Sequence, residues 1–155
     1  MYRYKGKLDR CVDGDTVDLW VDLGFKIHTH KRFRLEHVNT PERGKKGFNE
    51  ATELLERLIV ENLDDEGYFW FESIKTGKYG RWILNSQPIT SVLALNYPYD
   101  KGFEIIMKGI RKSVRSGDTI DAQHYGHSKE WGFCYEILSD INSFGSDYFK
   151  ERLIV

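Results

Sequence analysis

A change of hydrophobic period constrains the fold of this chain more than any other feature. Residues 15–22 alternate strictly, with Val17, Leu19 and Val21 on one side and polar or amphipathic residues on the other. That period is typical of a half-buried strand. Over residues 48–63 the apolar side chains recur at helical spacing instead, with charged residues between them. The chain therefore predicts a β unit followed by an amphipathic helix.

Further segments extend this pattern on both sides. Residues 2–12 and 27–36 are typical of strands that flank the alternating strand in an antiparallel meander, and Asp13-Gly14 gives a turn signal. The aromatic run 68–71 and the segment 82–84 predict two more strands. Three strands, a helix and two strands follow the order of an OB-type barrel. We therefore expect an α+β fold, a five-stranded OB-fold β-barrel with two or three helices.

The second half of the chain has weaker signals. We interpret residues 85–130 as an insertion or rebuilt segment inside a single domain that spans residues 1–155. Within it, residues 103–114 have weak helical spacing. Residues 132–138 predict a strand, and residues 146–154 predict a short helix.

Charge and hydropathy exclude some classes of function. The net charge is −1, so no global positive field attracts nucleic acid, although the basic clusters 31–34 and 43–46 leave room for a local basic cleft. No apolar run approaches the roughly 18–20 residues that span a bilayer. The first residues lack the apolar stretch of a secretory signal. We expect a cytoplasmic protein without membrane partners, and the sequence sets no oligomeric state.

Two short segments carry oxygen ligands suited to a hard cation. Asp13-Gly14-Asp15 places two carboxylates in one turn, although Asp-Gly is also an ordinary hairpin turn. Asn39 offers an amide oxygen and Thr40 a backbone carbonyl, so both suit Ca²⁺ together with Asp15. Glu42 lies in a loop where a carboxylate can position or deprotonate a water molecule.

Two arginines have the chemistry of a phosphate clamp. Arg34 lies near the end of a predicted strand, and Arg81 follows Lys78-Tyr79-Gly80 at the start of another. A guanidinium group can fork onto two phosphate oxygens. Together they would stabilise charge that develops on a phosphoryl group.

Four motifs occur in an order that resembles the staphylococcal nuclease (thermonuclease) family. They are Val12-Asp-Gly-Asp-Thr-Val17, Phe33-Arg-Leu35, Val38-Asn-Thr-Pro-Glu42 and Lys78-Tyr-Gly-Arg81. The resemblance covers residues 1–84, and it resumes over 132–153. It implies a calcium-dependent endonuclease that hydrolyses DNA, with RNA as a second candidate substrate.

The resemblance also implies a role for each matching residue. Asp15 and the Thr40 carbonyl match ligands of the catalytic Ca²⁺, and Glu42 matches the carboxylate that acts as a general base or orients the attacking water. Arg34 and Arg81 match the arginines that bind the scissile phosphate. The residues that match contacts to a terminal phosphate and nucleotide are Lys78 and Tyr79.

One departure from the family pattern concerns the metal. Asn39 stands where the family has a second carboxylate, and a lower ligand charge weakens cation binding. We expect weaker calcium affinity rather than loss of activity, with Asp13 supplying some charge from outside the ligand set. An alternative function is a nucleic-acid or protein-binding module that has lost catalysis, since fold alone does not decide function.

Three other clusters have functional and structural interpretations. Paired histidines such as His28 and His30 suit a metal, but exposed loop histidines are commoner. The aromatic run 68–71 suits base stacking, but core packing is favoured. The basic residues 111–115 suit phosphate contacts or a solvated helix face.

Overall fold

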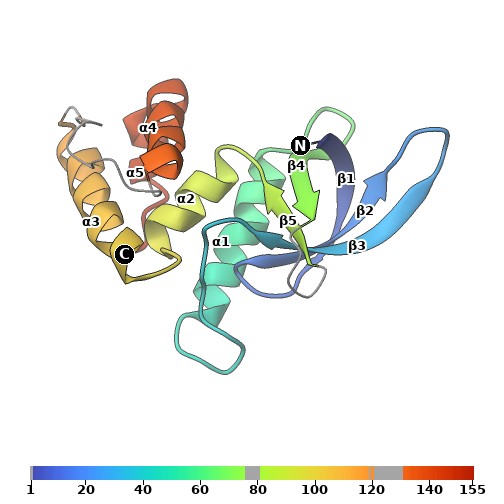
Figure 1. Ribbon diagram of the computed structural model, residues 1–155, viewed down its shortest axis with the longest axis horizontal. Coiled ribbons are helices and arrows are strands. Elements are labelled where there is room, and N and C mark those ends of the chain that lie inside the picture. Colours follow the sequence, from blue (N-terminus) through green and yellow to red (C-terminus); the bar gives the residue numbers. More distant parts are fainter. Residues whose placement is uncertain (1, 76–80, 119, 121–130) are drawn as a thin grey trace. The chain divides into compact units, whose positions relative to one another are not determined.

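A computed structural model describes residues 2–75, 81–118, 120 and 131–155 (Figure 1). Its contacts divide the chain into two compact units, Met1–Thr90 and Ser91–Val155. The first holds the β-barrel and its helix, and the second holds helices.

The first unit is a closed barrel of five strands, which confirms the predicted α+β class. The strands are β1 (Tyr2–Cys11), β2 (Thr16–Asp22), β3 (His28–Leu35), β4 (Phe69–Lys75) and β5 (Trp82–Asn85). Around the barrel they follow the order β1-β2-β3-β5-β4. β3 and β5 are parallel, and the other neighbouring pairs are antiparallel. The barrel is therefore mixed and OB-fold-like.

Alternation along the strands builds the barrel core. Val17, Leu19 and Val21 of β2 are buried, as the sequence predicts, and Phe69 and Phe71 of β4 are buried with them. Trp70, which lies between those two phenylalanines, is 40% exposed. The aromatic run 68–71 is therefore half core and half surface, because successive side chains of a strand point to opposite faces.

Helix α1 (Phe48–Glu61) connects the third and fourth strands. Its apolar stripe is buried, and it consists of Ala51, Leu54, Leu55, Leu58 and Ile59. Charged residues occupy the opposite face, as expected for a helix that covers a core on one side. The helix contacts β1, and Ala51 lies close to the turn that follows this strand.

The second unit contains α3 (Lys101–Ser116), α4 (Trp131–Phe144) and α5 (Ser146–Lys150), together with most of α2 (Ile89–Asn96). Asp100 begins α3, since its side chain accepts a hydrogen bond from the Phe103 N–H at 3.0 Å. Gly117 ends the helix with φ 76°, a left-handed conformation that suits glycine. No described helix of either unit is long and apolar enough to cross a membrane.

The strand predicted over residues 132–138 is wrong, because this segment belongs to α4. The buried side chains of α4 recur at helical spacing, at Phe133, Cys134, Ile137, Leu138 and Ile141. Phe133 packs edge-on against Phe103 of α3, with ring centres 5.8 Å apart. Packing against a neighbouring helix therefore overrides the β propensity of the aromatic residues.

Candidate active site

The turn between β1 and β2 is built around its own carboxylates. Asp13 accepts a hydrogen bond from the Asp15 N–H at 2.9 Å, and the Val12 N–H donates to the Thr16 carbonyl at 2.9 Å. A Cβ atom on Gly14 would lie 2.6 Å from the Ala51 Cβ. Only glycine fits there without displacing a neighbour, so this turn is held tightly against α1.

Asp15 lies where three segments meet. Its side chain is buried, and its Oδ1 accepts from the Thr16 hydroxyl at 2.9 Å. Its Oδ2 accepts from the Thr40 N–H at 3.1 Å and from Arg34 Nη2 at 3.5 Å. The sequence-predicted residues Asp15, Arg34 and Thr40 are therefore brought together around one carboxylate.

Arg34 and Arg81 line the same pocket, which has a volume of about 480 Å³. Arg34 pairs in register with Thr16 of β2 and with Ile83 of β5, and Arg81 immediately precedes β5. The parallel pairing of β3 with β5 thus brings together two arginines that lie far apart in the sequence. The pocket is lined by Val12, Asp13, Thr16, Arg32, Phe33, Arg34, Arg81 and Trp82.

The carboxylates at this pocket repel one another. Burial, together with the adjacent Asp15, raises the pKa of Asp13 to about 6. Two carboxylates in one turn disfavour a second negative charge. A cation bound at this turn would offset the negative charge of the two carboxylates.

Thr40 has a second feature of interest. Its side chain is only 7% exposed, and within the described part of the chain its Oγ1 has no hydrogen-bond partner. A buried hydroxyl without a partner costs free energy of about 1–3 kcal/mol. The residue thus holds an unused oxygen beside the Asp15 carboxylate.

Asn39 and Glu42 lie in the segment that connects β3 to α1, and both are exposed. Neither is among the residues that line the arginine pocket. The Glu42 carbonyl accepts from the Lys45 N–H at 3.0 Å, in a turn before α1. Asn39 directly precedes Thr40 in the chain, while Lys78 and Tyr79 lie outside the described residues.

A group that the sequence reasoning missed lies on the outer surface of the barrel. Ligand atoms of Asp9, Asp18 and His30 all lie within 4.8 Å of one another. The oxygens of Asp18 already accept hydrogen bonds from Arg10 and Arg32, which lowers the attraction for a cation. Strand alternation places Asp18 and His30 on one face, but only the β2–β3 register reveals how close they are.

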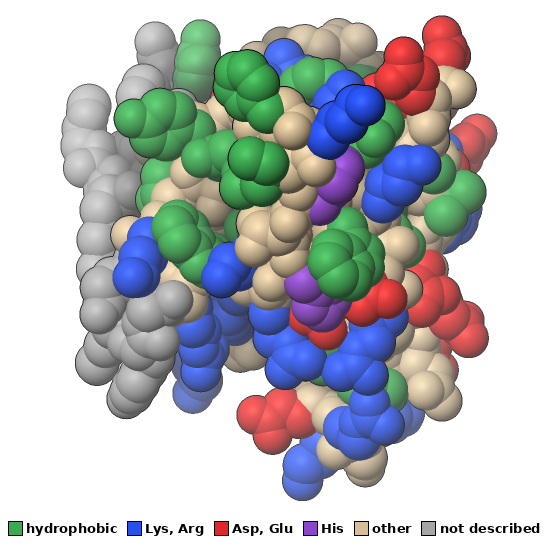
Figure 2. All heavy atoms as spheres, turned by 90° about the vertical axis from the view of Figure 1, so that its right-hand side faces the viewer, with side chains coloured by type: hydrophobic (Ala, Val, Ile, Leu, Met, Phe, Trp, Pro, Cys, Tyr) green, Lys and Arg blue, Asp and Glu red, His purple; other side chains and the backbone are tan. Residues whose placement is uncertain are grey.

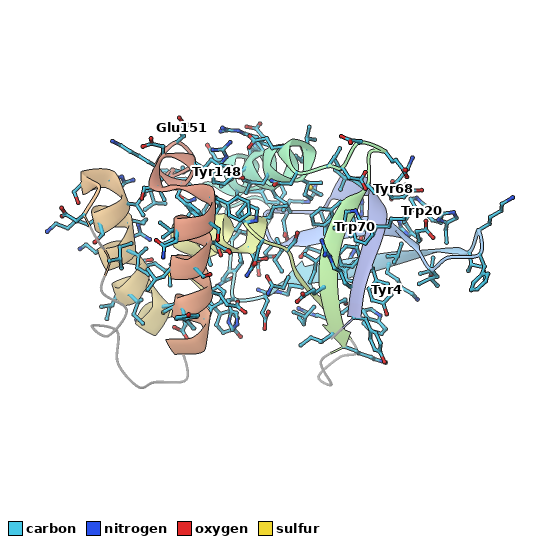
Figure 3. All side chains as sticks on the ribbon, turned by 90° about the horizontal axis from the view of Figure 1, so that it is seen from above. Tyr4, Trp20, Tyr68, Trp70, Tyr148 and Glu151 are labelled. Carbon is cyan, nitrogen blue, oxygen red and sulfur yellow. The ribbon has the colours of Figure 1, made fainter. Side chains whose placement is uncertain are left out.

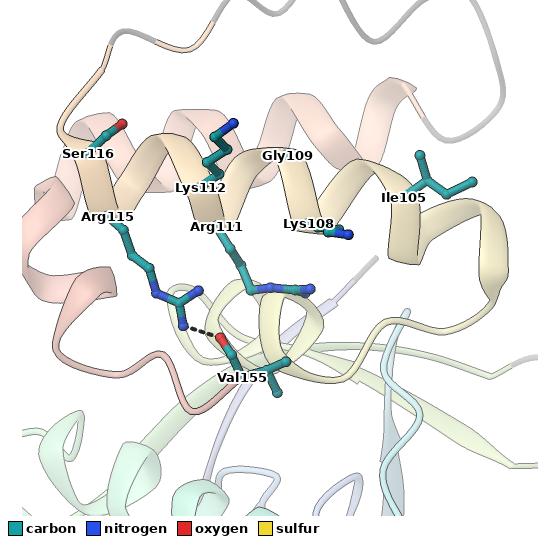
Figure 4. Close-up of a pocket in the computed structure, with 8 residues that line it drawn as sticks. All are labelled: Ile105, Lys108, Gly109, Arg111, Lys112, Arg115, Ser116 and Val155. Carbon is teal, nitrogen blue, oxygen red and sulfur yellow. Dashed lines mark hydrogen bonds between the residues drawn. The ribbon is translucent and has the colours of Figure 1, made fainter.

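The second unit has a basic hollow of about 850 Å³ along α3 (Figure 4). Lys108, Lys112 and Arg115 line it, and Arg115 donates a hydrogen bond to the Val155 carbonyl. Arg111 is different, because it is buried and donates to the Leu95 carbonyl at 2.6 Å and to Glu104 at 2.9 Å. Residue 111 therefore has a structural role, while its neighbours form a solvated face.

Comparisons with known proteins add no family to this picture. The sequence matches no protein-family model, and a search of curated proteins gives no match. The chain is an α+β protein whose closed five-stranded, OB-fold-like barrel is followed by several helices.

Proposed function

We propose that this protein is a calcium-dependent nuclease that hydrolyses phosphodiester bonds of DNA, with RNA as a second candidate substrate. The observation that carries the proposal is the pocket that Arg34 and Arg81 line beside the Asp13–Asp15 turn. Two guanidinium groups at one pocket suit the charge and geometry of a phosphate diester. The motif order shared with the staphylococcal nuclease family supports the same conclusion.

The arginines would hold the substrate and stabilise the charge that develops on the phosphoryl group. Asp15 accepts a hydrogen bond from Arg34, which orients this guanidinium toward the pocket. A lysine at either position would supply a point charge without the fork. Both positions therefore favour arginine if the reacting group is a diester.

The donor set beside the pocket fits a calcium ion in its chemistry. Asp15 supplies a carboxylate, Thr40 a backbone carbonyl and an unpaired buried hydroxyl, and Asn39 an amide oxygen. These are hard oxygen ligands. When bound, Ca²⁺ would supply Lewis acidity and a template for the reacting oxygens. The neutral side chain of Asn39 would keep its affinity low.

Glu42 would position or deprotonate the attacking water. Its loop is exposed and includes Gly44 and Gly47, both with positive φ. Catalytic contacts are often long before substrate binds. The proposal therefore requires the segment between Asn39 and Gly47 to bring the Glu42 carboxylate over the pocket when a diester is bound.

The alternative is a binding module that has lost catalysis. In favour of the enzyme, the chain retains Asp15, Arg34, Glu42 and Arg81, and departs from the family's catalytic set at Asn39 alone. A decayed site is expected to lose an arginine or the glutamate first. Retained binding without cleavage would favour the alternative.

The test is degradation of single- and double-stranded DNA and of RNA with Ca²⁺ and with EDTA. Arg81→Ala should abolish cleavage, because it removes half of the clamp. Arg57→Ala is the charge-matched control, since Arg57 is paired with Glu61 at 2.6 Å on the exposed face of α1. Equal activity of the two variants, or cleavage that survives EDTA, would refute the proposed site.

A further inference from the structure

The outer face of β2 and β3 forms a continuous row that begins at the arginine pocket. Thr16 and Arg34, which line the pocket, are paired in register. The next outward pair is Asp18 with Arg32, and the one after it is Trp20 with His30. A bound chain that leaves the pocket along this face therefore meets charged side chains first and aromatic ones second.

The middle of the row exposes two arginine side chains. Asp18 is buried, and its oxygens accept hydrogen bonds from Arg10 Nε at 3.1 Å and Arg32 Nε at 2.8 Å. The two arginine side chains are 60% and 57% exposed. One buried carboxylate thus orients two exposed guanidinium groups, and the exposed carboxylate of Asp9 has a ligand oxygen within 4.8 Å of that of Asp18. The exposed guanidinium groups are donors that suit backbone phosphates.

The end of the row is a fixed aromatic platform. Trp20 is 49% exposed, and its ring centre lies 4.6 Å from that of His30. His30 is held by Asp9, with 2.8 Å between Nε2 and Oδ2. Lys7 pairs in register with Trp20 on the other side. Figure 2 shows histidine side chains among hydrophobic, basic and acidic ones on one side of the molecule, and Figure 3 labels Trp20 on the barrel.

We propose that this row, from the arginine pocket to Trp20, is a track for single-stranded nucleic acid. The inference rests on the proposed function, because the pocket holds the reacting phosphate. From Thr16 to Trp20 the strand spans about 13 Å at roughly 3.3 Å per residue. That length accommodates roughly four bases at a stacked spacing of about 3.4 Å. Phosphates contact Arg10 and Arg32, and a base stacks on Trp20.

The aromatic end of the track selects for unpaired bases. A base inside a duplex is already stacked on both faces, so it must leave the helix before it can cover Trp20. An unpaired strand offers a π-face at every base. The protein should therefore prefer single strands, and its affinity should rise with length until a base reaches Trp20.

The test is fluorescence anisotropy of labelled oligodeoxynucleotides of two and eight residues, measured in EDTA so that no cleavage occurs. For the wild type, the eight-residue strand should bind far more tightly than the two-residue strand. Trp20→Ala should weaken the binding of the longer strand by roughly 5- to 150-fold, the range expected for one stacked base. Trp20→Phe should restore most of the loss, because phenylalanine keeps a stacking face.

Trp70→Ala is the matched control. Trp70 is also exposed on the barrel, but it lies on β4, two strands from Trp20 (Figure 3). Its Nε1 donates to Asp64 at 2.9 Å, and the Arg3 guanidinium lies 5.1 Å from its ring. The control should stay within about twofold of the wild type. Equal losses in the two variants, or no loss in Trp20→Ala, would overturn the track.

A second readout separates the track from the proposed hydrolysis. Wild-type turnover of a small chromogenic phosphodiester, bis(p-nitrophenyl) phosphate, depends on the pocket and not on a stacked strand. If the diester is turned over but Trp20→Ala does not change oligonucleotide affinity, the track proposal is wrong and the nuclease proposal stands. If oligonucleotide binding depends on Trp20 but no diester is turned over, the nuclease proposal is wrong and the binding track stands.

Discussion

Replacing Gly14 by alanine should be among the most damaging small changes in the barrel unit. The added Cβ would lie 2.6 Å from the Ala51 Cβ and 2.8 Å from the Thr40 Cγ2, whereas ordinary contacts are 3.4–4 Å. The overlap is thus close to one ångström with Ala51. The neighbours cannot rotate away, because the Ala51 methyl is fixed to α1 and Thr40 is buried.

The size of the effect follows from the cost of overpacking. Forcing extra methyl groups into packed sites costs about 1–3 kcal/mol, and we expect Gly14→Ala to lie in the upper half of that range. If the turn moves to relieve the overlap, the 3.1 Å hydrogen bond from the Thr40 N–H to Asp15 lengthens. Activity should then fall even under conditions where the variant is fully folded.

Urea denaturation followed by circular dichroism measures this change. Gly132→Ala is the control, because a Cβ on Gly132 meets no described atom within 4 Å. The control lies within helix α4 and should gain up to about 1 kcal/mol from helix propensity. Gly14→Ala combined with Ala51→Gly should be less unstable than the sum of the two single changes. Additive effects, or equal stability of Gly14→Ala and its control, would refute the packing argument.

Three more predictions concern charge, thiol reactivity and the second unit. Hydrogen bonds from Arg32 hold the pKa of Asp18 below its ordinary value of 3.8. This carboxylate therefore stabilises the fold above that value, and the contribution is lost as pH falls through the lowered pKa. The difference in unfolding free energy between wild type and Asp18→Asn should therefore shrink in urea titrations taken down to about pH 2. Burial raises the pKa of Cys11 to about 12. In the variant Cys134→Ser, the Cys11 thiol should therefore react with Ellman's reagent on the order of 10²-fold more slowly in the folded protein than in urea. Equal rates in the two states would contradict this prediction. Arg111→Ala should lower the free energy of unfolding in urea by about 1–3 kcal/mol, because it leaves the buried Leu95 carbonyl without its donor. The exposed Lys112→Ala should change that free energy little.

The barrel could be predicted from sequence because each of its strands is marked locally. The strict alternation over residues 16–22 and the helical stripe of α1 each follow one period from end to end. Boundaries in this part agree within one or two residues, as for β1, which ends at Cys11 instead of residue 12, except that β4 continues four residues beyond the predicted run, to Lys75. In a half-buried element, the spacing of the apolar residues predicts both the type of element and the face that is buried.

The helical unit was less predictable for two different reasons. Every residue of α2 is buried, the polar Thr90, Ser91 and Asn96 included, and a helix that is buried on all sides has no amphipathic period to detect. In α4 the aromatic residues favour a strand locally, and the helical spacing becomes visible only when Ile141 is included. Helix α3 was anticipated, because its buried residues recur along one face.

The candidate site also has parts that could be predicted from sequence and parts that could not. Motifs identified Asp15, Thr40, Arg34 and Arg81, and the structure brings Arg34 into contact with Asp15 and lines one pocket with both arginines. The pairing of Trp20 with His30 carries no local signal, because it depends on the β2–β3 register. Contacts between strands are thus the part of a site that sequence reasoning loses first.

The most direct test of the account is the calcium dependence of DNA cleavage by wild type and by Asn39→Asp. A carboxylate directly before Thr40 in the chain should lower the calcium concentration for half-maximal cleavage, because cation affinity follows ligand charge. The account predicts calcium-dependent cleavage by the wild type and a leftward shift in the variant. If neither protein cleaves DNA at any calcium concentration, the proposed nuclease function is contradicted.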